Sequence, residues 1–310
     1  MAYDEILKTL ESWDAKSLIS LAQEDEEILI TLIRMLDEER FQLRVLALLE
    51  ELLPLRTNRE IYKELFPRLL LLLTRNRKTA VKAARVMKVL LLQEPPTKGD
   101  LRTLLKVMLD TPVEQNDPRW LELVDAADKL PPMDYRNVEN LVLELIRSDN
   151  PGLKLVGLKF AKSIPGIRAE EVIREVLGLL LNSNNPVIVD KALDLVFEIL
   201  TSPIPLRMED VIRYLYSPLK ALTESAPDAI ITSKAREVFS ALVKSAQRYY
   251  AIRPTEARES AKRLRREGLE YEAVFIEEIA GQPHSPVPYG KETLKMLTED
   301  RSDLPDFLKG

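Results

Sequence analysis

Apolar residues recur along this chain at the spacing of helices that bury one side. Three stretches share one arrangement, in which a small residue, Gly157, Ala192 or Ala235, has apolar residues four positions before it and four and seven positions after it. At about 3.6 residues per turn these positions share one side of a helix. Because the arrangement returns after 35 and then 43 residues, the sequence predicts stacked helical repeats.

The predicted helices come in pairs. Asp117-Pro118, Asn150-Pro151 and Asn185-Pro186 each place a capping side chain before a proline, which typically starts a helix, and another amphipathic segment precedes each of them. The predicted pairs are 27–36 with 40–53, 59–74 with 78–93, 98–110 with the segment after Asp117, 135–147 with that after Asn150, 169–181 with that after Asn185, and 209–223 with 228–250. We therefore expect an all-α, right-handed solenoid of about six to seven helix pairs.

The two ends of the chain differ from this pattern. Residues 1–24 are predicted to form two capping helices, residues 25–250 the repeats, and residues 251–281 a helical hairpin that turns at Gly268 and packs on the solenoid. Residues 282–310 begin with a proline-rich linker and end in an acidic and apolar tail, whose apolar residues are Leu304, Phe307 and Leu308. Three hypotheses remain open for the tail: it binds a partner, folds back on a basic groove of its own chain, or is a frayed terminus.

The paired helices resemble the HEAT and armadillo repeat families. The resemblance rests on an apolar residue followed four positions later by a small one, often with a basic residue between them, as in Leu43-Arg44 with Ala47 and Leu153-Lys154 with Gly157. Pro67 and Pro218 also lie inside first helices, where HEAT units often carry a proline. The resemblance covers about residues 25 to 245 and implies an architecture, in which the second helix of each pair lines the concave surface. The unit after Asp117 departs from it, because Glu122, Asp125 and Asp128 replace its apolar stripe.

Composition limits the cellular compartments that suit the protein. The 310 residues include no cysteine, so disulfides and thiolate metal ligands are excluded, and no long apolar segment predicts a membrane helix. The N-terminus resembles neither a secretory signal nor a transit peptide. We therefore expect a cytoplasmic protein that does not enter a membrane. Charged residues make up 31% of the chain, which is compatible with the ion-pair-rich surfaces of thermophile proteins.

The clearest functional signal is a basic ridge. Between residues 65 and 93 there are seven basic residues and no acidic one. Six of them form the predicted contact surface, namely Arg75, Arg77, Lys78, Lys82, Arg85 and Lys88. On a helix Lys78, Lys82, Arg85 and Lys88 share one stripe, which could bind an acidic protein segment or a phosphate backbone. The other interpretation is a solvated face whose charges pair with acidic neighbours in adjacent units.

A second basic region follows the last repeat. It consists of Arg248, Arg253, Arg258, Lys262, Arg263, Arg265 and Arg266, with Tyr249 and Tyr250 among them. Aromatic rings beside arginines can stack nucleic-acid bases, although tyrosines at the end of a long helix more often pack against the next element. The formal net charge of −5 argues against a dedicated nucleic-acid binder.

The sequence gives little support for an enzyme. Its single histidine, His284, lies in the proline-rich segment, and no phosphate-binding loop, dinucleotide fingerprint or metal motif occurs. HEAT-like DNA glycosylases would draw attention to Trp120, Asp125 and Asp128, but their spacing is not specific. We therefore predict a non-catalytic scaffold without cofactor, metal or small-molecule substrate, which binds a protein through its groove. The alternative is a nucleic-acid-binding solenoid that uses both basic regions.

Overall fold

The computed structural model describes residues 3–115, 117–130, 138–163, 169–202, 206–226 and 228–281. Within these residues the chain forms sixteen α-helices, short 3₁₀-helices and no β-strand, so the predicted all-α fold is confirmed. Residues 282–310, with the predicted tail residues Leu304, Phe307 and Leu308, lie outside the described residues.

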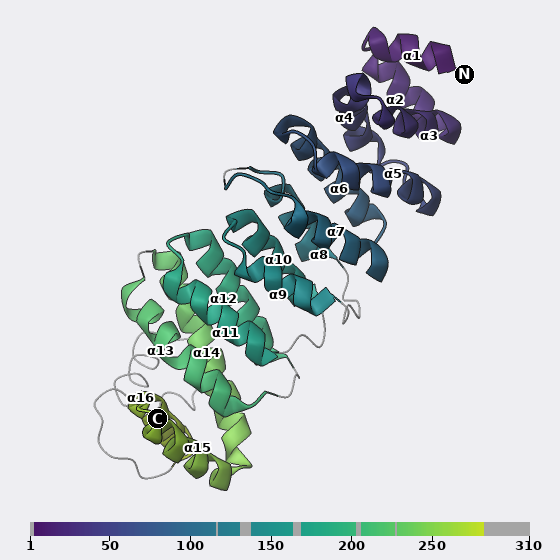
Figure 1. Ribbon diagram of the computed structural model, residues 1–310. Coiled ribbons are helices and arrows are strands. Elements are labelled where there is room, and N and C mark those ends of the chain that lie inside the picture. The colour runs from purple at the N-terminus through teal and green to yellow at the C-terminus, as the bar shows by residue number, and fades with distance from the viewer. Residues whose placement is uncertain are drawn as a thin grey trace. The chain divides into compact units, whose positions relative to one another are not determined.

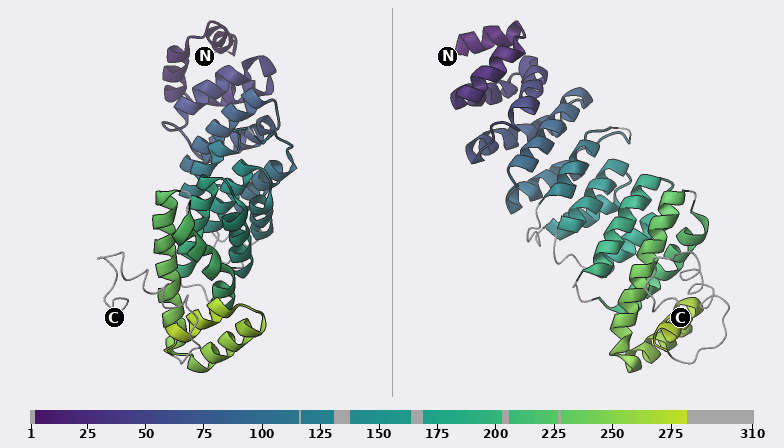
Figure 2. Two further views of the ribbon diagram at one scale, coloured as in Figure 1. Left: turned by 90° about the vertical axis from the view of Figure 1, so that its left-hand side faces the viewer. Right: turned by 180° about the vertical axis from the view of Figure 1, so that it is seen from behind.

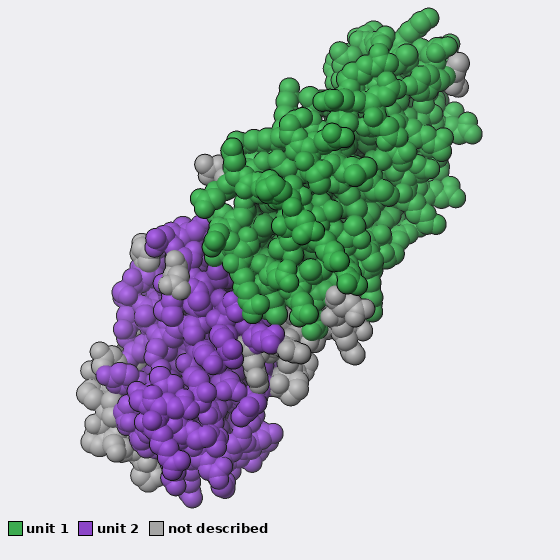
Figure 3. Space-filling view, viewed as in Figure 1, with its two compact units in different colours: residues 1–165 green, residues 166–310 purple. Residues whose placement is uncertain are grey.

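The chain divides into two units, residues 1–165 and 166–310 (Figure 3). The helices of the first unit are α1 (Tyr3–Glu11), α2 (Ala15–Glu24), α3 (Glu26–Arg34), η1 (Met35–Asp37), η2 (Glu39–Phe41), α4 (Gln42–Leu52), α5 (Arg59–Leu73), α6 (Arg77–Gln93), α7 (Lys98–Asp110), η3 (Leu121–Leu123), α8 (Val124–Lys129), α9 (Glu139–Arg147) and α10 (Pro151–Ser163). The odd-numbered helices pack one on the next, and so do the even-numbered ones (Figure 1). This unit therefore has two layers of helices, as stacked helical pairs require.

The second unit repeats this arrangement with longer helices. They are α11 (Ala169–Asn182), α12 (Pro186–Thr201), α13 (Met208–Ser225), α14 (Ala229–Ala251), α15 (Pro254–Arg266) and α16 (Glu270–Ile279). Helix α11 packs on α12 and α13, and α14 packs on α12 and α13. The hairpin of α15 and α16 contacts α14, the long light-green helix of Figure 2, and turns at Gly268, whose φ of 82° suits glycine.

Capping side chains start helices where the sequence predicted them, with one exception. The carboxamide oxygen of Asn150 accepts a hydrogen bond from the Gly152 N–H at 2.9 Å, and that of Asn185 accepts one from the Val187 N–H at 3.0 Å. After Asp117, however, a turn and the 3₁₀-helix η3 come first, and α8 begins only at Val124. The prediction that a helix starts directly at Asp117 is therefore wrong: the Asp117 carboxylate accepts a hydrogen bond from the Arg119 N–H at 3.0 Å, as a capping residue does, but a turn follows it.

The small residues at the middle of the stripes lie where helices approach most closely. Ala192 and Ala235 are fully buried. A Cβ added to Gly157 on α10 would lie 2.9 Å from the backbone nitrogen of Ile146 and 2.9 Å from the Cβ of Leu145, both on α9. Distances this short require the two helices to move apart. Gly157 is therefore fixed by packing between α9 and α10 rather than by backbone conformation.

We expect Gly157→Leu to lower the melting temperature, because overpacking costs about 1 to 3 kcal/mol or more. Gly157→Ala should also destabilise the protein, although alanine normally favours a helix. Gly178→Ala on α11 is the matched control, since its new Cβ would meet no atom within 4 Å. The control should stabilise the protein by about 0.5 to 1 kcal/mol. Equal shifts of the two alanine variants in a thermal unfolding experiment would contradict this placement.

Candidate functional site

The basic ridge lies on the solvent-exposed face of α6 and on the turn before it. Ala80, Ala83 and Met87 are buried on the opposite side of the helix, while Asn76 caps its start by accepting a hydrogen bond from the Thr79 N–H at 3.1 Å. The predicted ridge residues are thus brought together on one surface, with Arg75, Arg77 and Lys78 exposed and Lys82, Arg85 and Lys88 half-buried.

Acidic residues of the next repeat, Glu122 and Asp125, cover one half of this ridge. The Arg85 Nε donates a hydrogen bond to the Glu122 Oε1 at 2.8 Å, and the Lys88 Nζ lies 3.7 Å from the Glu122 Oε2 and 3.9 Å from the Asp125 Oδ2. The hydrogen bond to Glu122 and the charge of that carboxylate raise the pKa of Arg85. We call Arg85 and Lys88 the paired half of the ridge, because both make intramolecular ion pairs, a close one at Arg85 and two longer ones, to Glu122 and Asp125, at Lys88.

The other half of the ridge remains open. Among the described residues, Arg75, Lys78 and Lys82 have no ion-pair partner. Arg77 differs, since its charge acts on Asp117 and contributes to the low pKa of that carboxyl. We call Arg75, Lys78 and Lys82 the open half. From the sequence, pairing and binding are alternatives for the whole ridge. In the structure Arg85 and Lys88 are ion-paired, whereas Arg75, Lys78 and Lys82 have no ion pair with a described residue.

A buried ion pair holds the turn that presents Glu122. The side chains of Asp117 and Arg119 are 5% and 6% exposed, and the Arg119 Nη2 donates to the Asp117 Oδ2 at 2.7 Å. The Arg119 Nη1 donates to the carbonyl oxygens of Leu73 at 2.7 Å and Arg75 at 3.2 Å, at the end of α5. Burial raises the pKa of Asp117, but the hydrogen bonds and charge of Arg119 outweigh it, so that this pKa is lowered.

Glu122 and Asp125 do not occupy the buried stripe of their repeat. Trp120, Leu123, Ala126 and Ala127 are buried instead. The predicted replacement of the stripe is therefore wrong at Glu122 and Asp125, which are half-buried and exposed, respectively. Trp120 is fully buried whereas Asp125 is 71% exposed, so the residues compared with DNA glycosylases do not form a site; the side chain of Asp128 lies outside the described set.

The second basic region separates into three groups. Arg263 and Arg265 form ion pairs: the Arg263 Nε lies 2.9 Å from the Glu209 Oε2, and the Arg265 Nη2 lies 2.7 Å from the Glu277 Oε2. Exposed side chains on α15 make up the second group, namely Arg258, Lys262 and Arg266. Arg248 and Arg253 form the third group, which lines a pocket. Tyr250 is buried, so of the two tyrosines only Tyr249 reaches this pocket.

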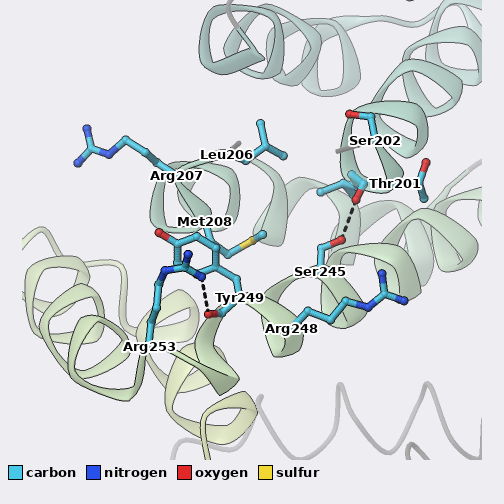
Figure 4. Close-up of a pocket in the computed structure, with 10 residues that line it drawn as sticks. Thr201, Ser202, Leu206, Arg207, Met208, Ser245, Arg248, Tyr249 and Arg253 are labelled. Atoms are coloured by element: carbon cyan, nitrogen blue, oxygen red, sulfur yellow. Dashed lines mark hydrogen bonds between the residues drawn. The ribbon is translucent and has the colours of Figure 1, made fainter. Parts of the chain in front are cut away.

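The pocket has a volume of about 510 Å³ and lies between the end of α12, the start of α13 and the end of α14 (Figure 4). Arg207, which the sequence analysis did not single out, joins Arg248 and Arg253 in its lining. The Arg253 guanidinium lies 4.4 Å from the centre of the Tyr249 ring. Burial and a hydrogen bond to Glu256 raise the pKa of Tyr249, whereas the charges of Arg253 and Arg207 oppose this shift, so both arginines lie near the ring.

The described residues contain no cluster of three or more acidic or histidine side chains suited to a metal ion. None of the described helices combines the length and apolar character needed to cross a bilayer.

Comparison with known proteins identifies the architecture. The archaeal HEAT-like repeats protein from Thermococcus onnurineus NA1 superposes with a TM-score of 0.68 and 21% sequence identity, over 79% of this chain and 98% of that chain. The fold is that of a HEAT-like repeat protein. Four solved chains match in all, whereas no family model and no curated protein sequence matches. The predicted HEAT-like architecture is confirmed, and at this identity the likeness concerns the fold alone.

We expect Asp117→Asn to lower the free energy of unfolding by about 3 to 5 kcal/mol at neutral pH, because it leaves the buried Arg119 without its counter-charge. The lowered pKa of Asp117 means that the wild-type pair stabilises the protein above about pH 4 and loses this effect as the pH falls further. The difference between wild type and variant in denaturant unfolding should therefore shrink in acid. Asp125→Asn, at an exposed residue, should change stability little; an equal loss in both variants would contradict the role of the pair.

Proposed function

We propose that this protein is a non-catalytic, cytoplasmic scaffold that binds an acidic segment of another protein through the open half of the basic ridge. HEAT-like stacking supports a binding role in general, because successive helix pairs expose a continuous outer face. The observation that carries the proposal is the division of the ridge: Arg85 and Lys88 are ion-paired, while Arg75, Lys78 and Lys82 face solvent without a described partner.

Unpaired cations on a rigid helix favour an acidic ligand. Lys78 and Lys82 are one turn apart on α6, so their ammonium groups are positioned by the same helix. Leu71, near the end of α5 and one turn before Arg75, is 67% exposed. A protein segment that carries both carboxylates and an apolar residue would complement this combination. Charge would mainly accelerate association and select the partner, and the apolar contact would add affinity.

A nucleic-acid backbone fits the ridge less well. A duplex laid along α6 would pass from the open half to the paired half, where the carboxylates of Glu122 and Asp125 repel phosphate. A salt titration with duplex and single-stranded DNA and RNA tests this alternative. Phosphate binding through the ridge would appear at low salt and weaken steeply as salt rises.

The double variant Lys78→Glu with Lys82→Glu should abolish binding of the scaffold's protein partner, because it reverses the charge of the open half. Partners are captured from native cell extract and quantified for the wild type and each variant. Arg102→Glu with Lys106→Glu is the matched control: both residues are exposed on α7, have no described ion-pair partner, and give the same charge change. Capture of the same proteins at the same levels by all three forms would contradict the proposal.

Glu122→Gln should strengthen the same interaction. The substitution removes the carboxylate that pairs with Arg85 and Lys88 and so extends the open half along α6. We expect roughly threefold to tenfold tighter binding of the captured partner at low salt, because one or two additional surface cations would face it. The effect should vanish in high salt. Weaker binding in the Glu122→Gln variant would show that this carboxylate belongs to the contact surface instead.

A further inference from the structure

The pocket of the second unit combines three arginines with an apolar wall, and no proposal above uses it. We propose that this pocket binds a nucleoside phosphate, either as a free nucleotide or as a nucleotide of a single strand. Ten described residues line it, including Arg207, Arg248 and Arg253, and none of them is acidic. Its lining therefore carries a positive formal charge, which Asp210 and Glu256 nearby compensate only in part.

The arginines are only weakly compensated by their own chain. Arg248 is exposed and has no ion pair with a described residue. The Arg207 Nε lies 3.6 Å from the Asp210 Oδ2 with 73% of its side chain exposed, and the Arg253 Nε lies 3.8 Å from the Glu256 Oε2. Arg263 and Arg265, by contrast, each make ion pairs shorter than 3 Å a few turns away. The loosely paired or unpaired arginines Arg207, Arg248 and Arg253 are thus the ones that line the pocket.

Side chains of the chain itself already occupy the helix ends at the pocket. Carbonyl groups at the end of α12 already accept hydrogen bonds from hydroxyls: the Thr201 hydroxyl donates to Phe197 O at 2.8 Å, and the Ser245 hydroxyl to Leu200 O at 2.8 Å. Helix α13 begins at the pocket with Met208, and its first turn carries the carboxylates of Glu209 and Asp210, which offset the positive helix end. The positive charge of the pocket therefore comes from its arginines, while the negative end of α12 is largely occupied.

The other lining residues form the surface that would contact the base of a nucleoside. Leu200, Leu206 and Met208 contribute an apolar surface, and Tyr249 contributes its ring. In Figure 4 Arg207, Arg253 and Tyr249 lie on one side of Met208, and Ser245 and Arg248 on the other. An inorganic phosphate would leave the apolar surface uncovered, whereas a nucleoside phosphate places a flat base beside it. The volume of about 510 Å³ lies in the range of ligand pockets, about 300 to 1,000 Å³.

Isothermal titration tests the proposal with adenosine 5′-monophosphate, adenosine 5′-triphosphate, a short single-stranded oligonucleotide, adenosine and inorganic phosphate. We expect saturable binding of at least one phosphorylated nucleoside probe, and binding at least about tenfold weaker for adenosine and for inorganic phosphate. Preference for the free nucleotides or for the oligonucleotide identifies the source. Arg248→Gln with Arg253→Gln should weaken the interaction by about tenfold or more, because charge-assisted hydrogen bonds to phosphate are lost.

Lys262→Gln with Arg266→Gln is the matched control, since it removes the same charge from exposed residues of α15 outside the pocket. This control should bind as the wild type does, with both double variants retaining the wild-type circular dichroism. Equal weakening in the two double variants would overturn the proposal, as would absence of binding to every nucleotide probe or tighter binding of a phosphoserine peptide. The site is independent of the open half of the ridge, so Arg248→Gln with Arg253→Gln should leave capture of the protein partner unchanged.

Discussion

Close packing between helices is the constraint on which this protein depends. Each helix buries a stripe against its partner and against the helices of neighbouring pairs, so the middle of the stripe must stay small. At Gly157 even one methyl group would press into the backbone of α9. Once the stripes are buried, two layers of helices follow within each unit. Side chains outside the stripes are not constrained by this packing, so they can differ from one repeat to the next.

The first use of these outer side chains is to join successive repeats. Arg59 on α5 pairs with Asp100 on α7, Arg85 on α6 pairs with Glu122 on η3, and Lys234 on α14 lies 2.6 Å from Asp194 on α12. A cationic residue therefore indicates a binding site only when its neighbours in the next repeat leave it without an ion pair. The open half of the ridge and the arginines of the pocket are candidates for binding because this internal pairing leaves them weakly compensated.

Most of the helices follow from local sequence, whereas the candidate sites do not. Apolar spacing locates α7 and α11 almost residue by residue, and capping residues locate the starts of α10 and α12, since both signals are local. Asp117 misled the same reasoning because its partner, Arg119, also bonds carbonyl groups at the end of α5. The pairing of Arg85 with Glu122 depends on how the helices stack, as does the placement of Arg207 and Arg248 around one pocket. Hydrophobic spacing does not fix how one helix aligns with the next. The predicted domain boundaries and binding residues remain predictions.

Arg119 has a consequence for the dynamics of the first unit. In a stack of repeats each pair contacts only its neighbours, which allows pairs to open one at a time. The Arg119 guanidinium, however, bonds the Leu73 carbonyl 46 residues earlier in the chain and the Asp117 carboxylate of its own turn. Separating η3 from α5 would remove the hydrogen bonds that the Arg119 Nη1 donates to the Leu73 and Arg75 carbonyl groups. The middle of the first unit should therefore open as a single foldon, whose amide hydrogens exchange together rather than repeat by repeat.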